Sequence, residues 1–186
     1  MTTERFAPLA EATMTPEQQR VAAKISAGPR GTWRIGPFNA LLRSPEIADR
    51  IQQVGAYVRF ESSIEPRLTE LAILLCARRW TAQFEWYAHR KLAIEAGLRP
   101  AIADAIAEGR RPADLFEDEA IIHDFAAQLL QAGQVDDAAF AAVCERFGEP
   151  GVIDLIATLG YYTTISFVLN VGRVSIPADA RPLQPL

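Results

Sequence analysis

Residues 65–97, EPRLTELAILLCARRWTAQFEWYAHRKLAIEAG, hold the one dense group of titratable and aromatic side chains on an otherwise alanine-rich background. Glu85 and His89 are four residues apart in this stretch, so on a helix they share one face. Glu70 lies earlier on an apolar segment, where a neighbouring helix could bring it against that pair. We predict that Glu70, Glu85 and His89 form the functional centre.

The imidazole of His89 suits proton transfer, because its unperturbed pKa of about 6.5 lets it give or take a proton near neutral pH. Glu85 could accept a hydrogen bond from one ring nitrogen and leave the other directed at a substrate. Glu70 could act as a second acid or base, or as the counter-charge of a protonated His89. Together these residues have the chemistry of a general acid–base site. The alternative is a surface Glu–His pair, which stabilises a helix by only a few tenths of a kcal/mol.

Aromatic and basic side chains around this centre could bind a substrate. Four aromatic residues could wall an apolar pocket, or could serve core or subunit packing: Trp80, Phe84, Trp86 and Tyr87. Paired basic residues such as Arg78-Arg79 could hold a carboxylate through paired hydrogen bonds, or could lie on a solvated helix face. The predicted substrate-binding residues are Trp86, Arg90, Arg79 and Asn39.

Charge and spacing argue against several other chemistries. The formal net charge of -4 gives no electrostatic reason to expect nucleic acid or an anionic membrane as a partner. The two histidines form neither a His-x3-His nor a His-Glu-x2-His motif, so no metal site is predicted. No GxGxxG or P-loop motif occurs, and no cofactor is predicted. His123, on a different segment, is expected to be packed or at the surface.

Cys76 and Cys144 lie far apart, in neither a metal-ligand spacing nor a CxxC pair. We predict that both are buried, reduced thiols in a cytoplasmic protein. The N-terminal residues MTTERFAPLAEATM contain no apolar core of signal-peptide length. The longest uncharged run, residues 155–172, contains several threonines, a serine and an asparagine, so a core or subunit-interface helix is favoured over a membrane span.

Helix start and stop signals recur along the chain, and no segment shows sustained period-two alternation. The predicted helices cover residues 15–28, 38–42, 44–58, a central pair that begins at Pro66 and Thr81 and ends at Gly97, then 100–109, 117–133, 136–148 and 150–170. The predicted fold class is therefore all-α, a compact multi-helix bundle. We expect a single domain over residues 1–186, with extended tails at 1–14 and 173–186.

The ordered set Arg67-Leu68-Thr69-Glu70-Leu71, Trp80, Glu85-Trp86, His89 and Ala96-Gly97 resembles the carboxymuconolactone decarboxylase family, which includes the alkylhydroperoxidase D-like (AhpD-like) proteins. The segments GPFNALLRSPEIADRIQQVGAYVRF and VDDAAFAAVCERFG resemble the same family, so the likeness covers most of the chain. The resemblance implies a compact all-helical fold that assembles as a homotrimer or a homohexamer.

The resemblance also implies which branch of the family this chain is similar to. Members of the peroxidase branch carry a glutamate, a CxxC pair and a histidine; Glu70 and His89 match, but the cysteine positions fall on Ala82 and Glu85. Peroxide reduction by thiols needs a reactive thiolate and a disulfide partner, so it is not expected here. The decarboxylase branch lacks the CxxC pair. The resemblance to this branch implies that His89 protonates a carbanion, that Glu85 orients His89 and that Glu70 completes the proton network.

Three functions therefore stay open. The leading one is a cofactor-independent lyase, a decarboxylase acting on a small anionic lactone or oxoacid of aromatic-compound catabolism. The second is an AhpD-type antioxidant peroxidase, and the third is a non-catalytic oligomeric protein that binds a small molecule. A site in which Glu70 and His89 approach within hydrogen-bonding distance favours the lyase over the binding protein.

Overall fold

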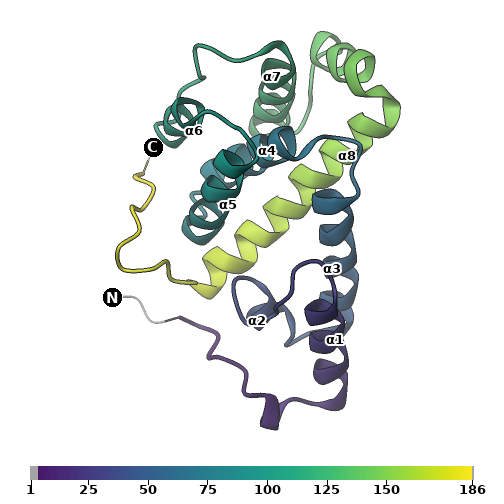
Figure 1. Cartoon of the computed structure of the whole chain (residues 1–186), viewed down its shortest axis with the longest axis vertical. Helices are drawn as coiled ribbons and strands as arrows, with labels where there is room; N and C mark the ends of the chain where they lie inside the picture. The colour runs from purple at the N-terminus through teal and green to yellow at the C-terminus, as the bar shows by residue number, and fades with distance from the viewer. Residues whose placement is uncertain (1–3, 186) are drawn as a thin grey trace.

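Eight α-helices and one short 3-10 helix make up the secondary structure of residues 4–185, the part of the chain that the computed structural model describes (Figure 1). Their bounds are η1 Glu11–Thr13, α1 Pro16–Ala27, α2 Phe38–Leu41, α3 Pro45–Phe60, α4 Pro66–Arg79, α5 Gln83–Glu95, α6 Pro100–Ala107, α7 Glu117–Ala132 and α8 Asp137–Gly172. No strand occurs within residues 4–185, so the all-α prediction is confirmed.

Most helices begin where the sequence signals place them. Helices α1, α3, α4 and α6 each have proline at the first helical position, where its missing N–H leaves no hydrogen bond unmade. Thr15 and Gln18 form a capping box at the start of α1, where the sequence predicts a helix to begin. The predicted start of α5 at Thr81 was wrong: Ala82 is the N-cap, and Thr81 makes the turn after α4 with a left-handed φ of 47°.

Helix α8 joins two segments that the sequence predicts as separate helices. Gly148 has φ 72° and ψ 174°, so the backbone leaves helical geometry there and α8 bends just before Pro150. By length and composition α8 is the one helix among the described residues that could cross a membrane, but 56% of its most apolar window is buried inside the fold. It therefore packs as a core helix, as the polar residues of the segment indicate.

Helix α4 lies at the centre of the bundle and packs against α5, α7 and α8 (Figure 1). Its apolar side chains Leu71 and Leu74 are fully buried, and one connected hydrophobic core includes residues of all eight α-helices. On the other side of α8, helices α1–α3 form a second group, with α3 in contact with α8. The antiparallel α4–α5 hairpin packs against α7 and α8, and this packing fixes the relative positions of its side chains.

The two terminal segments run along the surface of the bundle (Figure 1). Arg5 donates its backbone N–H to the carbonyl of Gly172, and Glu4 accepts hydrogen bonds from Ser175. The C-terminal segment then passes α5, where Gln83 makes two hydrogen bonds to the backbone of Leu183. Apart from η1, residues 4–14 and 174–185 contain no helix; residues 1–3 and 186 of the predicted tails lie outside the described residues.

Candidate active site

The α4–α5 hairpin brings Glu70, Glu85 and His89 together. The Nδ1 atom of His89 lies 2.7 Å from Oε2 of Glu70 on α4, and its Nε2 atom lies 3.1 Å from Oε1 of Glu85 on α5. All three residues are buried, with 8% of Glu70, 4% of Glu85 and 5% of His89 exposed. The arrangement is therefore a buried triad and not a solvated surface pair.

The local sequence explains how each carboxylate is positioned. Glu85 lies in the first turn of α5, where the partial positive charge of the helix N-terminus favours an anionic side chain. It is also one turn before His89, so the two side chains meet on one face. Glu70 is set on the α5 side of α4, between residues whose apolar side chains fill the core.

His89 is charged at neutral pH in this setting. Burial acts to lower the pKa of its imidazole, but the negative charges of Glu70 and Glu85 and their hydrogen bonds outweigh burial and raise the pKa to about 9. The protonated ring donates a hydrogen bond to Glu70 and makes an ion pair with Glu85. The triad thus stores one transferable proton on His89, between two acidic side chains.

We expected one ring nitrogen of His89 to face a substrate. In the structure both ring nitrogens face carboxylates, so this expectation was wrong. Each carboxylate uses one oxygen for His89. The other oxygens, Oε1 of Glu70 and Oε2 of Glu85, make no hydrogen bond to any residue within 4–185. These two oxygens are the atoms of the triad that are available to a reacting molecule, with His89 behind them as the proton store.

Two tyrosines of α8 border the triad. The ring of Tyr162 meets the ring of His89 edge to face, with centroids 5.0 Å apart, and Tyr161 meets Tyr162 in the same way at 5.0 Å. Tyr162 is 1% exposed, and within the described part of the chain its hydroxyl has no hydrogen-bond partner. A buried hydroxyl without a partner is destabilising unless a bound molecule or water satisfies it.

Comparison with solved structures finds the same architecture in a crystal structure titled alkylhydroperoxidase AhpD core, an uncharacterized peroxidase-related protein from Ralstonia eutropha JMP134. The match covers 96% of this chain and 95% of that chain, with a TM-score of 0.76 and 16% sequence identity. The chain has the AhpD-core fold. No protein-family model matches the chain, and no curated protein sequence matches it. The likeness therefore establishes the fold, and the activity has to be argued from the site.

Within this AhpD-core fold, neither cysteine is placed for thiol chemistry at the triad. Cys76 is fully buried beside Thr163, and burial raises the pKa of its thiol to about 12, so it stays protonated. Cys144 is only half-buried, not buried as predicted, because it lies on the outer part of α8 before the bend at Gly148. The two thiols are free and form no disulfide.

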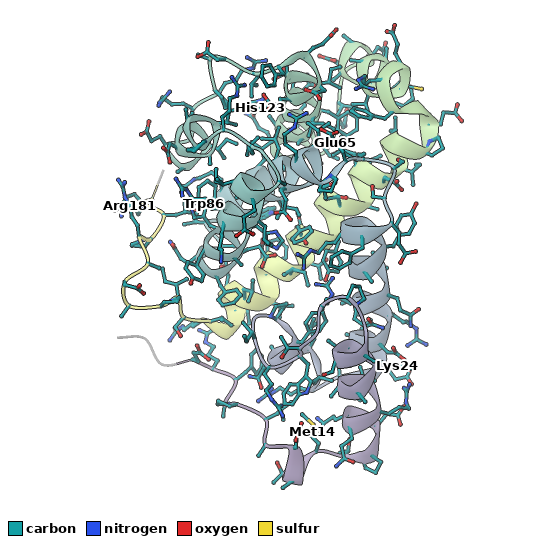
Figure 2. The ribbon with its side chains drawn as sticks, viewed as in Figure 1. Met14, Lys24, Glu65, Trp86, His123 and Arg181 are labelled. Atoms are coloured by element: carbon teal, nitrogen blue, oxygen red, sulfur yellow. The ribbon has the colours of Figure 1, made fainter. Side chains whose placement is uncertain are left out.

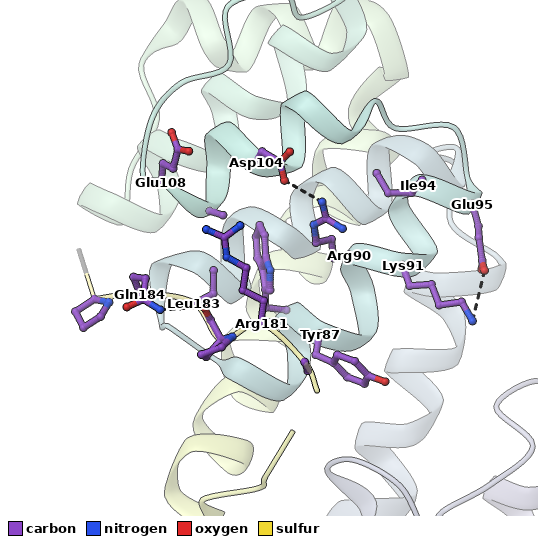
Figure 3. Close-up of a pocket in the computed structure, with 15 residues that line it drawn as sticks. Tyr87, Arg90, Lys91, Ile94, Glu95, Asp104, Glu108, Arg181, Leu183 and Gln184 are labelled. Carbon is purple, nitrogen blue, oxygen red and sulfur yellow. Dashed lines mark hydrogen bonds and ion pairs between the residues drawn. The ribbon is translucent and has the colours of Figure 1, made fainter. Parts of the chain in front are cut away.

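Two of the four predicted substrate-binding residues line a surface groove on the far side of α5 from the triad. Trp86 and Arg90 border a groove of about 830 Å³ between α5, α6 and the C-terminal segment, where Trp86 and Arg181 lie on the same side of the molecule (Figure 2). Arg90 points toward Asp104, with an ion-pair distance of 2.8 Å, and Lys91 points toward Glu95 (Figure 3). The groove does not include Glu70, Glu85 or His89.

Arg79 and Asn39 lie away from the triad. Arg79, at the end of α4, stacks over the ring of Trp80 and donates a hydrogen bond to the carbonyl of Leu130. Asn39 bonds the backbone of the N-terminal segment, accepting from Leu9 and donating to Phe6. Their roles in substrate binding stay predictions, and the structure assigns both a packing role.

Sequence reasoning missed Tyr162, which contacts His89, and the two residues packed behind it, Tyr161 of α8 and Arg30 of the loop before α2. Arg30 donates a hydrogen bond of 3.0 Å to the hydroxyl of Tyr161, which is 131 residues away in the chain. Only the paired tyrosines in an apolar helix gave a signal that could have found them. His123 is packed as expected, with its Nδ1 atom 2.9 Å from Asp124.

Proposed function

We propose that this protein is a cofactor-independent lyase that decarboxylates a small unsaturated lactone acid or oxoacid, with Glu70, His89 and Glu85 as its proton-transfer centre. The observation that supports this most is the buried imidazole held between two carboxylates. Such a group holds a proton at neutral pH and exchanges it through short hydrogen bonds, which is what general acid catalysis needs. The resemblance to the decarboxylase branch, which lacks the CxxC pair, supports the same reaction class.

The proposed reaction breaks the bond between the carboxylate carbon and the adjacent carbon of the substrate. Carbon dioxide leaves, and the electron pair passes into the conjugated carbonyl group as a dienolate. His89 gives its proton to the facing oxygen of a triad carboxylate. After this carboxyl group turns its O–H toward the substrate, it protonates the carbon, and a proton from water restores His89. The enzyme thus supplies a positioned proton and must stabilise the developing oxyanion.

The test is incubation of the purified protein with 4-carboxymuconolactone, and with acetoacetate as an acyclic probe, while carbon dioxide release is followed. Run in D2O, the reaction places one deuterium from solvent on a carbon of the dienolate or, for acetoacetate, of the enolate. His89→Gln should abolish release of carbon dioxide, whereas His123→Gln should leave it unchanged. Absence of turnover with both probes at high enzyme concentration, or turnover that survives His89→Gln, contradicts the proposal.

We also propose that the protein acts as a homo-oligomer, as a trimer or a hexamer. After the bend at Gly148, four large apolar side chains of α8 are at least 42% exposed: Ile153, Ile156, Phe167 and Val171. At 3.6 residues per turn they fall within about 60° of one another around the helix axis. They form an apolar stripe that the exposed residues Gly160 and Thr164 interrupt, and an exposed stripe of this kind is what a separated subunit presents at its interface.

A further inference from the structure

An anionic substrate can bind beside the acidic triad only if a cationic side chain lies nearby. Two acidic side chains flank one imidazolium, and such a site repels an anionic substrate unless further cationic groups lie nearby. The predicted arginines do not meet this demand, since Arg79 stacks on Trp80 and Arg90 is paired with Asp104. The cation has to come from elsewhere in the fold.

Arg30 lies directly against Tyr161, and the charges of Arg30 and Arg59 both act on the tyrosines of the site. Burial is the main cause that raises the pKa of Tyr161 to about 12; the charge of Arg30 acts against it, Glu85 adds to it, and Arg59 also acts against it. On Tyr162 burial again dominates in raising the pKa, with Arg59 acting against it and Glu85 and Glu70 adding to it. Neither arginine makes an ion pair with a carboxylate within residues 4–185.

The position of Arg30 is built into the fold. Its guanidinium lies over the rings of Phe38 and Tyr161, at 5.1 Å and 5.9 Å from their centroids, and its Nη2 atom donates to the hydroxyl of Tyr161. A Cβ atom on Gly55 of α3 would lie 2.2 Å from that Nη2 atom and 2.2 Å from that hydroxyl. Helix α3 thus lacks a side chain at the one place where Arg30 and Tyr161 pack on its backbone.

Two buried donor groups along this line have no partner in the described chain. They are Nε of Arg30 and the hydroxyl of Tyr162. Arg30 contacts Tyr161, Tyr161 contacts Tyr162, and Tyr162 contacts His89, so the line runs continuously from the loop before α2 to the triad. A guanidinium donor at one end and a phenol donor at the other suit a molecule with a carboxylate and a second oxygen acceptor.

We propose that Arg30 and Tyr162 form the substrate-binding side of the triad: Arg30 binds the carboxylate of a small unsaturated ring acid, and the Tyr162 hydroxyl donates a hydrogen bond to its ring or carbonyl oxygen. In the decarboxylation proposed above, on which this assignment rests, Tyr162 would hold the oxygen that gains negative charge. The charge of Arg30 acts against the negative charge of the triad, so that the site can accept a monoanion.

Binding can be tested separately from turnover with 2-furoate, a flat unsaturated ring that carries one carboxylate and cannot yield a stabilised dienolate. Titration calorimetry should show that wild-type protein binds 2-furoate and that Arg30→Gln weakens binding at least tenfold. Gly55→Ala, which displaces Arg30 without changing its chemistry, should weaken binding similarly. The matched control is Arg146→Gln, because Arg146 also stacks on an aromatic ring, that of Phe147, but lies on the outer part of α8.

Turnover of 4-carboxymuconolactone provides the second measurement. Removing one donor to a developing oxyanion typically lowers kcat about 10²–10³-fold, and Tyr162→Phe should do so with little change in KM. Tyr87→Phe, on the exposed face of α5, is the control. If wild-type protein fails to bind 2-furoate, or if Arg30→Gln and Gly55→Ala bind it as wild type does, the assignment is overturned. Binding that depends on Arg30 without any turnover instead supports the assignment and contradicts the lyase proposal.

Discussion

The Oε2 atom of Glu70 lies 2.7 Å from Nδ1 of His89, in a buried contact that joins α4 to α5 across 19 residues of sequence. Glu85 meets the other ring nitrogen, so the imidazolium is enclosed by negative charge on both sides. This contact has a structural and a chemical consequence: it ties the central hairpin together, and it holds a proton in the interior of the fold.

Replacing His89 by Gln should affect both stability and activity. The substitution leaves Glu70 and Glu85 buried without a cation, and loss of one partner of a buried ion pair typically destabilises a protein by about 3–5 kcal/mol. Loss of the general acid should lower turnover about 10²–10⁴-fold. Urea denaturation and carbon dioxide release measure the two effects. His123→Gln is the control and should change stability by no more than about 1 kcal/mol, because its partner Asp124 is exposed.

Stability should depend on pH through His89. Because its pKa is raised from 6.5 to about 9 in the folded protein, the stabilisation is fully present below pH 6.5 and is lost as pH rises through about 9. The difference in free energy of unfolding between wild type and His89→Gln should therefore shrink between pH 6.5 and 9. Denaturant titrations of both proteins across this range measure it, and a difference that stays constant with pH contradicts the assignment.

The two cysteines should differ sharply in reactivity. Cys76 is fully buried with its thiol held protonated, whereas Cys144 is half-buried. In native protein at neutral pH, Ellman's reagent should modify Cys144 at most, and Cys76 only after denaturation. Cys144→Ala should give a native protein that takes up no label. Rapid labelling of Cys76 in the native variant, or a peroxide-induced mass change that a thiol reductant reverses, would favour thiol-dependent peroxidase chemistry.

The apolar stripe of α8 should control self-association. Light scattering of the wild-type protein should give the mass of a trimer or a hexamer, and the double substitution Ile153→Asp and Phe167→Asp should give a monomer. Both residues are exposed in the single chain, so the helical content should not change. Ile35→Asp, at an equally exposed apolar residue in the loop before α2, is the control. A wild-type monomer contradicts the proposed assembly.

The sequence was sufficient to predict the helical fold and the triad, for identifiable reasons. Proline at first helical positions and glycine at helix ends punctuate the chain, and the four-residue spacing of Glu85 and His89 holds on any helix. Glu70 stood out because a carboxylate in an apolar helix needs a partner. These signals can be read from short segments of the sequence, or from one carboxylate in an otherwise apolar helix. They do not depend on which distant segments pack together.

The rest of the site depends on packing between distant segments. Arg30 reaches Tyr161 only because α3 carries Gly55 at the crossing point, and no local pattern around Arg30 indicates this. Arginines close to the triad in sequence were favoured instead, but the helix direction carries Arg90 to the outer groove. Nothing in the sequence around Asn39 indicates that its amide hydrogen-bonds the backbone of the N-terminal segment.

NMR of protein labelled with ¹⁵N-histidine can observe directly whether His89 holds a proton between the two carboxylates. The chain has two histidines, so His123→Gln leaves a single imidazole to observe. We predict that at pH 7.5 both ring nitrogens of His89 are protonated, and that the ring titrates near pH 9. A neutral ring at pH 7.5, with titration near the ordinary value of about 6.5, would contradict the account.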